Sequence, residues 1–559
     1  MLRLVECVPN FSEGRNQEVI AAITGQIRGV SGVSLLNVDP GADTNRTVVT
    51  FVGPPDAVEE AAFRGIRKAA ELIDMSIHKG EHPRMGATDV CPFVPVSDVT
   101  MEECVNIARR LGDRVGNELD IPVYLYEHAA TSESRRSLAD IRKGEYEGLA
   151  EKLIDPEWRP DYGAPRFNVR SGATVIGARQ FLIAYNVNLN TRDKRLANRI
   201  AFRIREAGTA RKDAAGNTLH DEKGEVVRTP GTLKAVRAVG WYIEEYGCAQ
   251  ISMNLLDYTT TAVHHAFDEV CRQADALGVR VTGSELVGLI PREAILESGR
   301  YFLRKQSRTA AVPERELIHA AVRSLGLSEL SPFRPEERVI EYVIAPKEKK
   351  LVALPVADFV DEVSMDSPAP GGGTVAALAS GMGAALVAMV GALTAGKKGF
   401  EDRLPEMERL GMEAQALKDR LIGDCDEDTK AFNRVLEAGR GKPKNPVEQG
   451  NQARAVDEAT KGATLVPLGV LERSMRVVEL AAQMVERGNP SSLSDAGVGG
   501  LMAAAGAEGA YLNVLINLPG VADREWAAAT LQRARECIAA VRERSAALGA
   551  AVAQRLESR

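Results

Sequence analysis

The chain has 559 residues, of which 45% are hydrophobic and 26% are charged, a composition typical of folded globular proteins. A single hydrophobic core rarely grows to this size, so the length predicts several domains. The formal net charge of -7 and the pI of about 5.8 exclude the broad basic surface that nucleic-acid binding requires.

The seven cysteines are dispersed along the chain, and none of them forms a CxxC pair. This usage indicates reduced thiols in a reducing compartment. The first residues, MLRLVECVPNFSEG, carry glutamate and proline where a signal peptide needs an apolar run. We therefore expect a cytoplasmic protein.

Strands and helices alternate in the first part of the chain. Residues 33–39 and 46–53 read as strands, and residues 56–73 place apolar side chains at helical spacing. A helix over 101–111 and a strand over 121–126 follow. Such interleaving predicts an α+β layer sandwich of the split βαβ kind.

A second set of α/β elements follows. Residues 181–189, 236–242 and 249–255 read as strands, and residues 194–207 read as a helix. The polar stretch 211–231 predicts a hairpin or loop.

The pattern of predicted secondary structure changes after the charged run PKEKK at residues 346–350. Strand signals nearly vanish beyond it, and long helical patterns predict an all-α helical bundle. We therefore predict a multidomain protein with two α/β subdomains and a helical domain. The predicted bounds are 1–180 and 181–343 for the subdomains, 344–354 for a linker and 355–559 for the bundle.

One uncharged stretch, residues 374–396, is long enough to span a bilayer, for which roughly 20 apolar residues suffice. Most of its residues are Ala and Gly, which permit close helix packing, and no aromatic residue flanks it. The similar stretch 496–518 contains Glu508. The pattern therefore favours a buried helix of a bundle, and we predict no membrane span.

The first candidate site is a histidine segment. His78, Glu81 and His82 match H-x-x-E-H, a pattern that presents two histidines to zinc from one helix face. Gly80 and Pro83 disfavour that helix, so we predict no metal. A loop histidine suits proton transfer, because imidazole titrates near neutral pH. A surface histidine in a turn is the alternative.

Two arginines are candidates for binding a carboxylate. Arg46 follows Asn45 at the start of a predicted strand, after a turn that begins near Asp39. A guanidinium at such an edge can bind a carboxylate in bidentate fashion. An exposed salt bridge is the alternative for Arg46. Arg84 lies two residues after His82.

A glycine-rich turn precedes the apolar stretch. Gly371, Gly372 and Gly373 superficially fit a dinucleotide-binding pattern, but Pro368 and Pro370 stand where that pattern needs a strand. The turn instead opens a helix, whose free N–H groups suit an anion or the polar edge of a heterocycle. A plain capping loop is the alternative.

One carboxylate falls on an apolar helix face. At helical spacing, Asp428 lies on the stripe of Leu421, Cys425, Phe432 and Val435. Burial would raise the pKa of this carboxyl group and make it a proton carrier near neutral pH. A structural ion pair with Lys397 or Lys398 is the alternative.

These segments together resemble the formiminotransferase–cyclodeaminase family over nearly the whole chain. The resemblance is carried by LVECVPNFSEGRNQEVI, DTNRTVVTFVGPP, IDMSIHKGEHPRMGATDVCPFVPV, SGATVIGARQFLIAYNVNL and NLLDYTTTAVH in the first part, and by SPAPGGGTVAALASGMGAALVAMV, DEDTKAFN and AYLNVLINL in the second. The polar stretch 211–231 looks longer than in the animal form.

The resemblance implies a transferase half that moves the formimino group of N-formimino-L-glutamate to tetrahydrofolate. It also implies a helical half that closes the product to 5,10-methenyltetrahydrofolate and releases ammonia. The family's base histidine corresponds to His82, and its catalytic aspartate corresponds to Asp428. Its folate-binding stretch falls on Gly163, Ala164, Pro165, Arg166, Phe167, Asn168, Val169, Arg170, Ser171 and Gly172.

The expected co-substrate is tetrahydrofolate with a polyglutamate tail, and a homo-oligomer is expected. Arg46 and Arg84 are our candidates for the carboxylates of formiminoglutamate. The Gly371–Gly373 turn and Lys397 are candidates for holding the pterin or the tail. Alternatives are a single active half, a helical half that acts as a methenyltetrahydrofolate cyclohydrolase, a folate-binding protein without catalysis, and a zinc peptidase.

Overall fold

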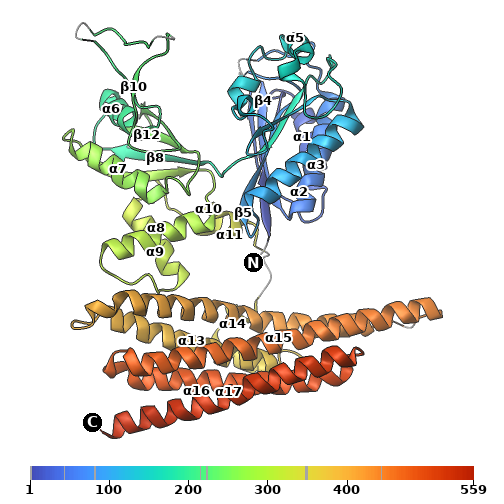
Figure 1. Ribbon diagram of the computed structural model, residues 1–559, viewed down its shortest axis with the longest axis vertical. Helices are drawn as coiled ribbons and strands as arrows, with labels where there is room; N and C mark the ends of the chain where they lie inside the picture. Colours follow the sequence, from blue (N-terminus) through green and yellow to red (C-terminus); the bar gives the residue numbers. More distant parts are fainter. Residues whose placement is uncertain are drawn as a thin grey trace. The chain divides into compact units, whose positions relative to one another are not determined.

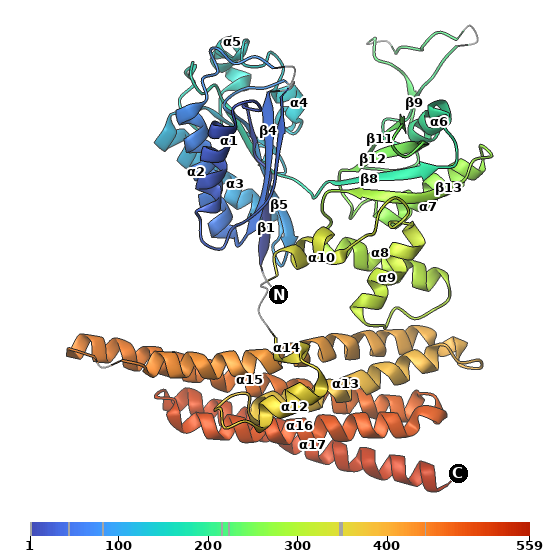
Figure 2. The same cartoon turned by 180° about the vertical axis from the view of Figure 1, so that it is seen from behind.

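The computed structural model of the protein describes residues 3–42, 45–80, 83–213, 216–221, 224–345, 350–441 and 443–558. The chain divides into two compact units, which are drawn in Figures 1 and 2. One unit is Met1–Ala294 with Gly326–Ile344, and the other is Ile295–Leu325 with Ala345–Arg559. Mixed sheets build the first unit and helices build the second, which confirms the predicted fold class.

Within the described residues, the first subdomain is built on a seven-stranded sheet. In this sheet β7 (Thr174–Ala178) lies parallel between β5 (Thr88–Ser97) and β6 (Val123–Glu127). Because α3 (Met101–Leu119) connects β5 to β6, this is the predicted split βαβ unit. The other elements are β1 (Leu4–Cys7), β2 (Asn10–Phe11), α1 (Gln17–Arg28), β3 (Ser34–Gly41), β4 (Arg46–Gly53), α2 (Pro55–Leu72), α4 (Leu138–Ile141) and α5 (Leu149–Ile154).

Helix α3 is longer than the sequence predicted. It begins with a capping box in which Thr100 and Glu103 satisfy each other's backbone N–H groups. The predicted end was residue 111, but buried Val115 and Gly116 extend the apolar face to Leu119. Continued burial therefore outweighs the polar residues that suggested an earlier end.

The second subdomain contains an antiparallel four-stranded sheet, in the part of the chain that the structure describes. Its strands, in spatial order, are β11 (Val236–Ile243), β12 (Cys248–Leu255), β8 (Ile183–Leu189) and β13 (Val281–Val287). Helices α6 (Lys194–Ile204) and α7 (Val263–Asp275) cover one face of this sheet (Figure 2). The polar insertion forms a hairpin with β9 (Thr209–Ala210) and β10 (Arg228–Thr229) at its base.

The second unit is an all-α helical bundle. Helix α13 packs against α14 and α16, and α15 packs against α14, α16 and α17.

Residues 295–325 group with this bundle, although the sequence analysis placed them in the second subdomain. The helices that follow β13 in the chain are α8 (Arg292–Lys305), α9 (Glu314–Leu325), α10 (Pro335–Arg338) and α11 (Ile340–Val343). The bundle helices are α12 (Val356–Ser364), α13 (Gly372–Ala395), α14 (Leu404–Gly439), α15 (Pro446–Arg487), α16 (Leu493–Asn517) and α17 (Arg524–Glu557).

The apolar helix α13 owes its close packing to small residues. A Cβ atom added at Gly383 would lie 2.5 Å from the carbonyl oxygen of Gly499, and one added at Gly506 would lie 2.0 Å from Ser380 Oγ. Two helical segments of the described residues, Gly372–Ala395 and Pro490–Gly520, are long and apolar enough to cross a membrane. Both are packed in this bundle through their glycine and alanine faces.

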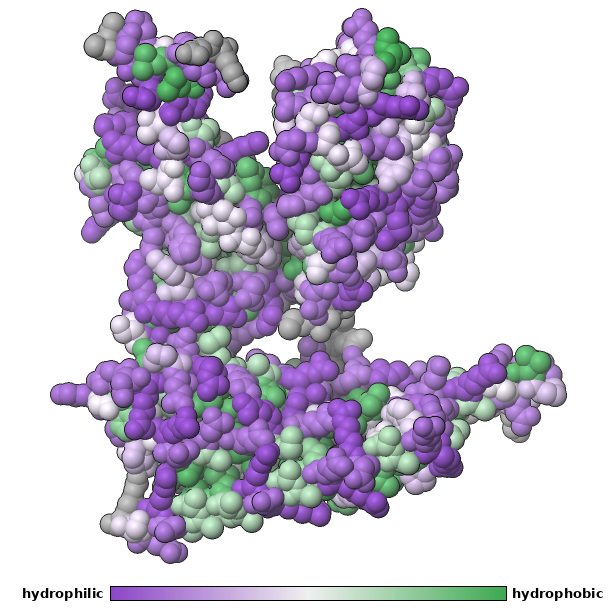
Figure 3. Space-filling view, in the orientation of Figure 1, coloured by the Kyte–Doolittle hydropathy of each residue, from purple (hydrophilic) through white to green (hydrophobic). Residues whose placement is uncertain are grey.

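The bundle also exposes large apolar side chains. Met382, Met389 and Leu393 are exposed on α13, and Leu512 and Ile516 are exposed on α16. Hydrophobic areas extend over the helical part in the view of Figure 3. Contiguous apolar surface of this kind is a common feature of protein interfaces.

Candidate active sites

The first candidate site lies at the start of β5, where three segments meet. Gly86 forms a β-bridge with Gly172, and the Ala87 N–H donates to the carbonyl of Ser171 at 2.9 Å. The Tyr146 N–H donates to the carbonyl of Arg84 at 2.9 Å. The structure therefore brings together the histidine segment, the predicted folate-binding stretch and the loop of residues 142–148.

The predicted base His82 lies outside the described residues, and so does Glu81. The chain is described up to Gly80 and again from Pro83. The role of His82 therefore stays a prediction.

His78 is held between two hydrogen-bond partners. Its Nδ1 accepts from Arg84 Nε at 3.3 Å, and its Nε2 lies 3.0 Å from the carbonyl oxygen of Asn45. Only the tautomer with its proton on Nε2 satisfies both contacts. Burial lowers the pKa of His78, with the Asn45 carbonyl opposing that shift. His78 is therefore a neutral structural link at pH 7.

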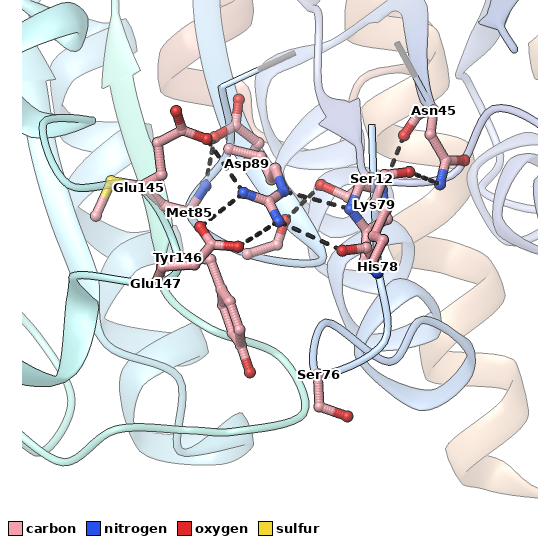
Figure 4. A network of polar contacts seen from close by, with 12 residues as sticks. Ser12, Asn45, Ser76, His78, Lys79, Met85, Asp89, Glu145, Tyr146 and Glu147 are labelled. Carbon is pink, nitrogen blue, oxygen red and sulfur yellow. Dashed lines mark hydrogen bonds and ion pairs between the residues drawn. The ribbon is translucent and has the colours of Figure 1, made fainter. Parts of the chain in front are cut away.

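Arg84 is buried and already paired with the carboxylates of Glu145 and Glu147, which are labelled in Figure 4. Its Nη1 lies 3.1 Å from Glu145 Oε2, and its Nη2 lies 2.7 Å from Glu147 Oε1. The hydrogen bond to Glu147 raises the pKa of Arg84. A substrate carboxylate can bind this guanidinium only by replacing one of these partners.

A cavity of about 420 Å³ adjoins this cluster. Its lining includes the Arg84 guanidinium, the Lys79 side chain and the two glutamates. The cations of Lys79 and Arg84 can therefore bind the carboxylates of a ligand. The ligand would replace Glu145 or Glu147 as the partner of Arg84. The lining residues are Lys79, Gly80, Arg84, Gly144, Glu145 and Glu147.

A second charged pair supports the same walls. The carboxylate of Asp89 is fully buried, accepts from the Met85 N–H at 3.0 Å and pairs with Arg142. Asp89 therefore connects the start of β5 to the loop that carries Glu145. Sequence analysis did not select Asp89 or Arg142, although a carboxylate inside a buried strand was a usable signal.

The neighbouring substrate candidates lie at the start of β4. Burial lowers the pKa of Arg46, and the charges of Asp89 and Asp39 oppose that shift. Asn45 accepts from the Gly14 N–H and donates to the carbonyl of Lys79, both at 3.0 Å. Asn45 thus fastens β4 to the histidine segment, while Asp39 is exposed on β3.

The predicted folate-binding stretch is anchored at several points. Arg166 pairs with Asp120, and Asn168 Nδ2 donates to the Asp120 carbonyl at 3.1 Å. The carbonyl of Val169 accepts from the Tyr146 hydroxyl at 2.5 Å. The residues from Ala164 to Arg166 are exposed, and Ser171 and Gly172 are buried against β5.

The second candidate site lies where α14 meets the N-terminus of α13. Asp428 Oδ2 accepts from the Thr374 hydroxyl at 3.0 Å. A Cβ at Gly373 would lie 2.3 Å from Asp428 Oδ1, so the glycine lets the carboxylate reach the helix end. Helix α13 has no side-chain cap of its own at Gly371, and Asp428 supplies a carboxylate from another helix.

Burial raises the pKa of Asp428, opposed by Thr374 and reinforced by the nearby charge of Asp424. Among the described residues, no cation lies within 4 Å of the Asp428 carboxylate. The proposed structural ion pair with Lys397 or Lys398 is therefore absent from that part of the chain.

Asp424, one helical turn before Asp428, is the residue that sequence analysis missed. It is 3% exposed, accepts from Arg473 Nη2 at 2.5 Å and lies 3.5 Å from Arg420 Nε. The guanidinium of Arg473 lies over Gly469, where a Cβ would meet its Nη2 at 2.8 Å. The sequence signal was the spacing of four residues between Asp424 and Asp428.

The predicted apolar stripe around Asp428 was partly wrong. Leu421 and Cys425 are buried as expected, but Phe432 is 37% exposed. The buried side of α14 at this point is therefore the side of Leu421, Asp424 and Cys425. Asp428 lies at the border of this side rather than in its middle.

Lys397 lies at the other end of α13. Its Nζ donates to Asn489 Oδ1 at 2.6 Å and to Ser491 Oγ at 3.2 Å. Helix α13 has 24 residues, and at a rise of 1.5 Å per residue such a helix is about 36 Å long. Within one chain, Lys397 is therefore too far from Asp428 and the Gly371–Gly373 turn to hold the same pterin ring.

Comparison with known proteins finds similarity over nearly the whole chain. Residues 4–179 match the N-terminal subdomain of the formiminotransferase domain, residues 184–345 match the formiminotransferase domain, and residues 355–536 match formiminotransferase-cyclodeaminase. The formimidoyltransferase-cyclodeaminase of Gallus gallus is 45% identical over 548 residues, which cover 98% of each chain. The chain belongs to the formimidoyltransferase-cyclodeaminase family.

Two further relatives are each similar to only one part of the chain. The glutamate formimidoyltransferase of Streptococcus pyogenes is 41% identical over 304 residues, covering 54% of this chain and 94% of its own. The methenyltetrahydrofolate cyclohydrolase of Methylorubrum extorquens is 39% identical over 173 residues, covering 31% of this chain and 83% of its own. Members of the family act on folates, and no group of three possible metal-binding side chains lies among the described residues.

Proposed function

We propose that the protein is a bifunctional glutamate formimidoyltransferase and formimidoyltetrahydrofolate cyclodeaminase. The observation that carries the proposal is the end-to-end similarity to a relative of that name, with 45% identity over 98% of both chains. The α/β half then transfers the formimino group to tetrahydrofolate. The helical half closes the product to 5,10-methenyltetrahydrofolate and releases ammonia.

In the transfer step, N5 of tetrahydrofolate attacks the formimino carbon of formiminoglutamate. His82 accepts the N5 proton and returns a proton to the departing glutamate nitrogen. Such acid–base catalysis contributes typically 10²–10⁴-fold, so orientation of the two substrates supplies much of the remaining acceleration. Arg46 and Arg84 bind the substrate carboxylates, and the exchangeable partners of Arg84 support that assignment.

In the second step, N10 attacks the formimino carbon on N5, and the five-membered ring closes. Asp428 carries a proton from N10 to the nitrogen that leaves as ammonia. Its partial burial, its raised pKa and its distance from described cations support this role, because the carboxyl group can both accept and donate. The Gly371–Gly373 turn contributes the free N–H groups of α13.

The direct test is a coupled assay with the purified full-length protein, formiminoglutamate and tetrahydrofolate. We expect formation of the methenyl product, followed by its absorbance, with one ammonia released per product. A protein that binds tetrahydrofolate but forms neither product nor ammonia would contradict the proposal. Formation of 5-formiminotetrahydrofolate without ammonia would restrict the activity to the first half.

A cyclohydrolase activity is the second candidate for the helical half, because that half is 39% identical to a methenyltetrahydrofolate cyclohydrolase. Supplying 5,10-methenyltetrahydrofolate alone distinguishes the two. Rapid loss of its absorbance, with a rate above that of ammonia release from 5-formiminotetrahydrofolate, would favour the cyclohydrolase. We expect the opposite order of rates.

Three properties of the working enzyme form part of the proposal. A homo-oligomer is supported by the exposed apolar side chains of α13 and α16, including Met389 and Ile516. A cytoplasmic location fits the seven free thiols. A polyglutamylated co-substrate fits basic side chains such as Lys350 and Lys444, whereas Lys347, Lys349 and Lys442 lie outside the described residues.

A further inference from the structure

Helices α13 and α16 of the bundle pack against each other through a seam of small residues. A Cβ added at Gly506 of α16 would lie 2.0 Å from Ser380 Oγ of α13, and one added at Gly509 would lie 3.1 Å from the Cβ of Ala376. The two helices run antiparallel here, because the residue numbers rise along α16 while they fall along α13. These two positions of the seam therefore leave room only for small side chains.

The next position of the seam holds an amide instead. A Cβ added at Gly372 of α13 would lie 3.3 Å from Asn513 Nδ2 and 3.9 Å from Asn513 Oδ1. Residues three or four apart share one side of a helix, so Asn513 continues the side of Gly506 and Gly509. Gly372 is exposed and Asn513 is half-buried, so this end of the seam is open to solvent. The role of the amide has to be sought in its hydrogen bonds, because a smaller side chain would continue the seam.

One hydrogen bond fixes the orientation of this amide. Asn513 Nδ2 donates to the carbonyl of Gly509 at 2.8 Å. Because a carbonyl oxygen only accepts hydrogen bonds, the amide nitrogen must be the atom that faces Gly509, and Oδ1 faces away from it. Oδ1 has no hydrogen-bond partner among the residues that the structure describes. The amide therefore presents an unused acceptor.

The hydrogen bond to Gly509 does not account for the amide. In an α-helix the carbonyl of residue i accepts the backbone N–H of residue i+4, so the Gly509 carbonyl already has the Asn513 N–H as its partner. Asparagine side chains that bond such carbonyls are neutral to unfavourable inside helices. Asn517, one turn later, is different, because its Nδ2 donates to the carbonyl of Ala463 on α15 at 2.9 Å and links two helices. Asn517 therefore has a structural role that Asn513 lacks.

Asn513 lies beside the proposed proton carrier of the helical half. Asp428 Oδ1 approaches the place of a Cβ at Gly373, and the Asn513 amide approaches that of a Cβ at Gly372. Because these glycines are consecutive, the carboxylate from α14 and the amide from α16 flank the first turn of α13. Exposed Val375 lies on the same side of α13 as Gly372, one turn further on, and offers an apolar surface. Three helices bring a proton carrier, an acceptor and an apolar wall together, as a folate site requires.

We propose that Asn513 is a second catalytic residue of the helical half, and that its Oδ1 accepts a hydrogen bond from the formimino nitrogen of 5-formiminotetrahydrofolate. The inference rests on the proposed cyclodeaminase function and adds a residue to that site. The protonated formimino group carries two N–H donors, so it can bind Asn513 and Asp428 at the same time. A neutral amide suits this role, because it accepts the hydrogen bond without competing with Asp428 for the proton.

This contact positions the nitrogen for its departure. The lone pair of N10 forms a bond to the formimino carbon, and the π electrons of the carbon–nitrogen double bond move to the formimino nitrogen. Asp428 takes the proton of N10 and gives it to that nitrogen. The carbon–nitrogen bond then breaks with its electron pair on the nitrogen, and ammonia leaves as the N5 lone pair forms the new double bond. The nitrogen carries at least two N–H bonds throughout, so Asn513 can accept from it at each stage.

The test measures ring closure of supplied 5-formiminotetrahydrofolate by the full-length protein, followed by methenyl absorbance and ammonia release. Asn513→Ala removes the acceptor and leaves a side chain that fits the seam. We expect kcat to fall about 10- to 150-fold, the range for one hydrogen bond to a charged group. Formimino transfer and the melting temperature of the protein should not change.

A second variant distinguishes an acceptor for the substrate from an amide that only supports the helix. The carboxylate of Asn513→Asp can accept from the formimino nitrogen, but it cannot donate to Gly509 and it adds a charge at the end of the seam. A purely structural position would therefore tolerate alanine better than aspartate. We expect the opposite order, with a higher kcat for ring closure in Asn513→Asp than in Asn513→Ala. A higher kcat in Asn513→Ala would overturn the inference.

Asn517→Ala is the matched control, because it removes an amide from the same helix, one turn away. Loss of its hydrogen bond to Ala463 should lower the melting temperature, while kcat for ring closure stays within twofold of wild type. Equal losses of kcat in Asn513→Ala and Asn517→Ala would assign both amides to stability and overturn the inference.

The outcomes separate this inference from the proposed function. Wild-type protein that releases no ammonia from 5-formiminotetrahydrofolate would overturn the cyclodeaminase function, and the role of Asn513 with it. Wild-type protein that releases ammonia, with Asn513→Ala within twofold of it, would overturn the role of Asn513 alone.

Discussion

At the start of β5, Arg84 and Arg142 are each paired with protein carboxylates, whereas Asp428 in the bundle has no cation within 4 Å among the described residues. The first arrangement suits a substrate that brings its own carboxylates, because exchange of one anion for another preserves the charge balance. The second suits proton transfer, because a carboxylate held by a guanidinium would stay ionised.

The two regions also differ in what holds them. The first depends on loops tied by side-chain contacts, such as Asn45 to Lys79 and Asp89 to Met85. The second depends on the close approach of two long helices at Gly373. A local change should therefore affect binding at the first site and the position of one catalytic group at the second.

The largest expected effect comes from removing the acid function of Asp428. Asp428→Asn retains an oxygen that accepts from Thr374, so the helix contact survives, but the amide cannot carry the proton. We expect ring closure to fall by about 10²–10⁴-fold, the usual contribution of a proton-transferring group. Formimino transfer, measured as formation of 5-formiminotetrahydrofolate, should remain. Equal loss of both activities would remove the distinction between the two sites.

A glycine substitution tests whether helix packing positions the carboxylate. Gly373→Ala places a Cβ 2.3 Å from Asp428 Oδ1, so the carboxylate must move away from the end of α13. A displacement of about 1 Å can cost roughly 10²-fold in rate, and we expect a loss of that order in ring closure. The matched control is Gly423→Ala on α14, whose Cβ would find no neighbour within 4 Å. Similar kinetics in the two variants would contradict the positioning role.

Sequence reasoning predicted the elements of the fold more fully than the contacts of the sites. The split βαβ unit and the small-residue helix were predicted correctly, because the periodicity of apolar residues and the run of small residues can be read directly from the sequence. The apolar stripe on α14 was misplaced, because Phe432 is exposed and Asp424 is buried. Residue spacing alone does not predict which of two adjacent sides of a helix faces the core.

Contacts between distant segments were beyond the reach of the sequence. Nothing in the residues around Arg84 indicates that Glu145 and Glu147 are its partners, because they belong to a loop after β6. Likewise, the pairing of Asp424 with Arg473 depends on the packing of α14 against α15. Lys397 and the glycine turn were candidates for holding the same ligand, although the length of α13 separates them.

A smaller effect is expected at the transferase site. Arg46→Ala removes a half-buried guanidinium that is a candidate for a carboxylate of formiminoglutamate. Hydrogen bonds to charged groups contribute about 1.5–3 kcal/mol, so the KM for formiminoglutamate should rise about 10- to 150-fold. Ring closure of supplied 5-formiminotetrahydrofolate should not change. Arg64→Ala on α2 is the control, and an unchanged KM in Arg46→Ala would refute the assignment.

The smallest effect, a shift in pH dependence, tests whether the buried pair beside Asp428 tunes it. The charge of Asp424 raises the pKa of Asp428, after the larger contribution of burial. Asp424→Asn removes that charge and leaves Arg473 without its carboxylate partner, and both changes lower the pKa of Asp428. The carboxylate then stays ionised at lower pH.

The acidic limb of kcat for ring closure should therefore move to lower pH in Asp424→Asn, while the pH profile of formimino transfer stays in place. Asp424→Glu retains the charge and should restore the wild-type profile. Asp419→Asn, on the exposed side of the same helix, serves as the control. A limb that stays fixed, or moves to higher pH, would show that Asp424 only holds α14 against α15.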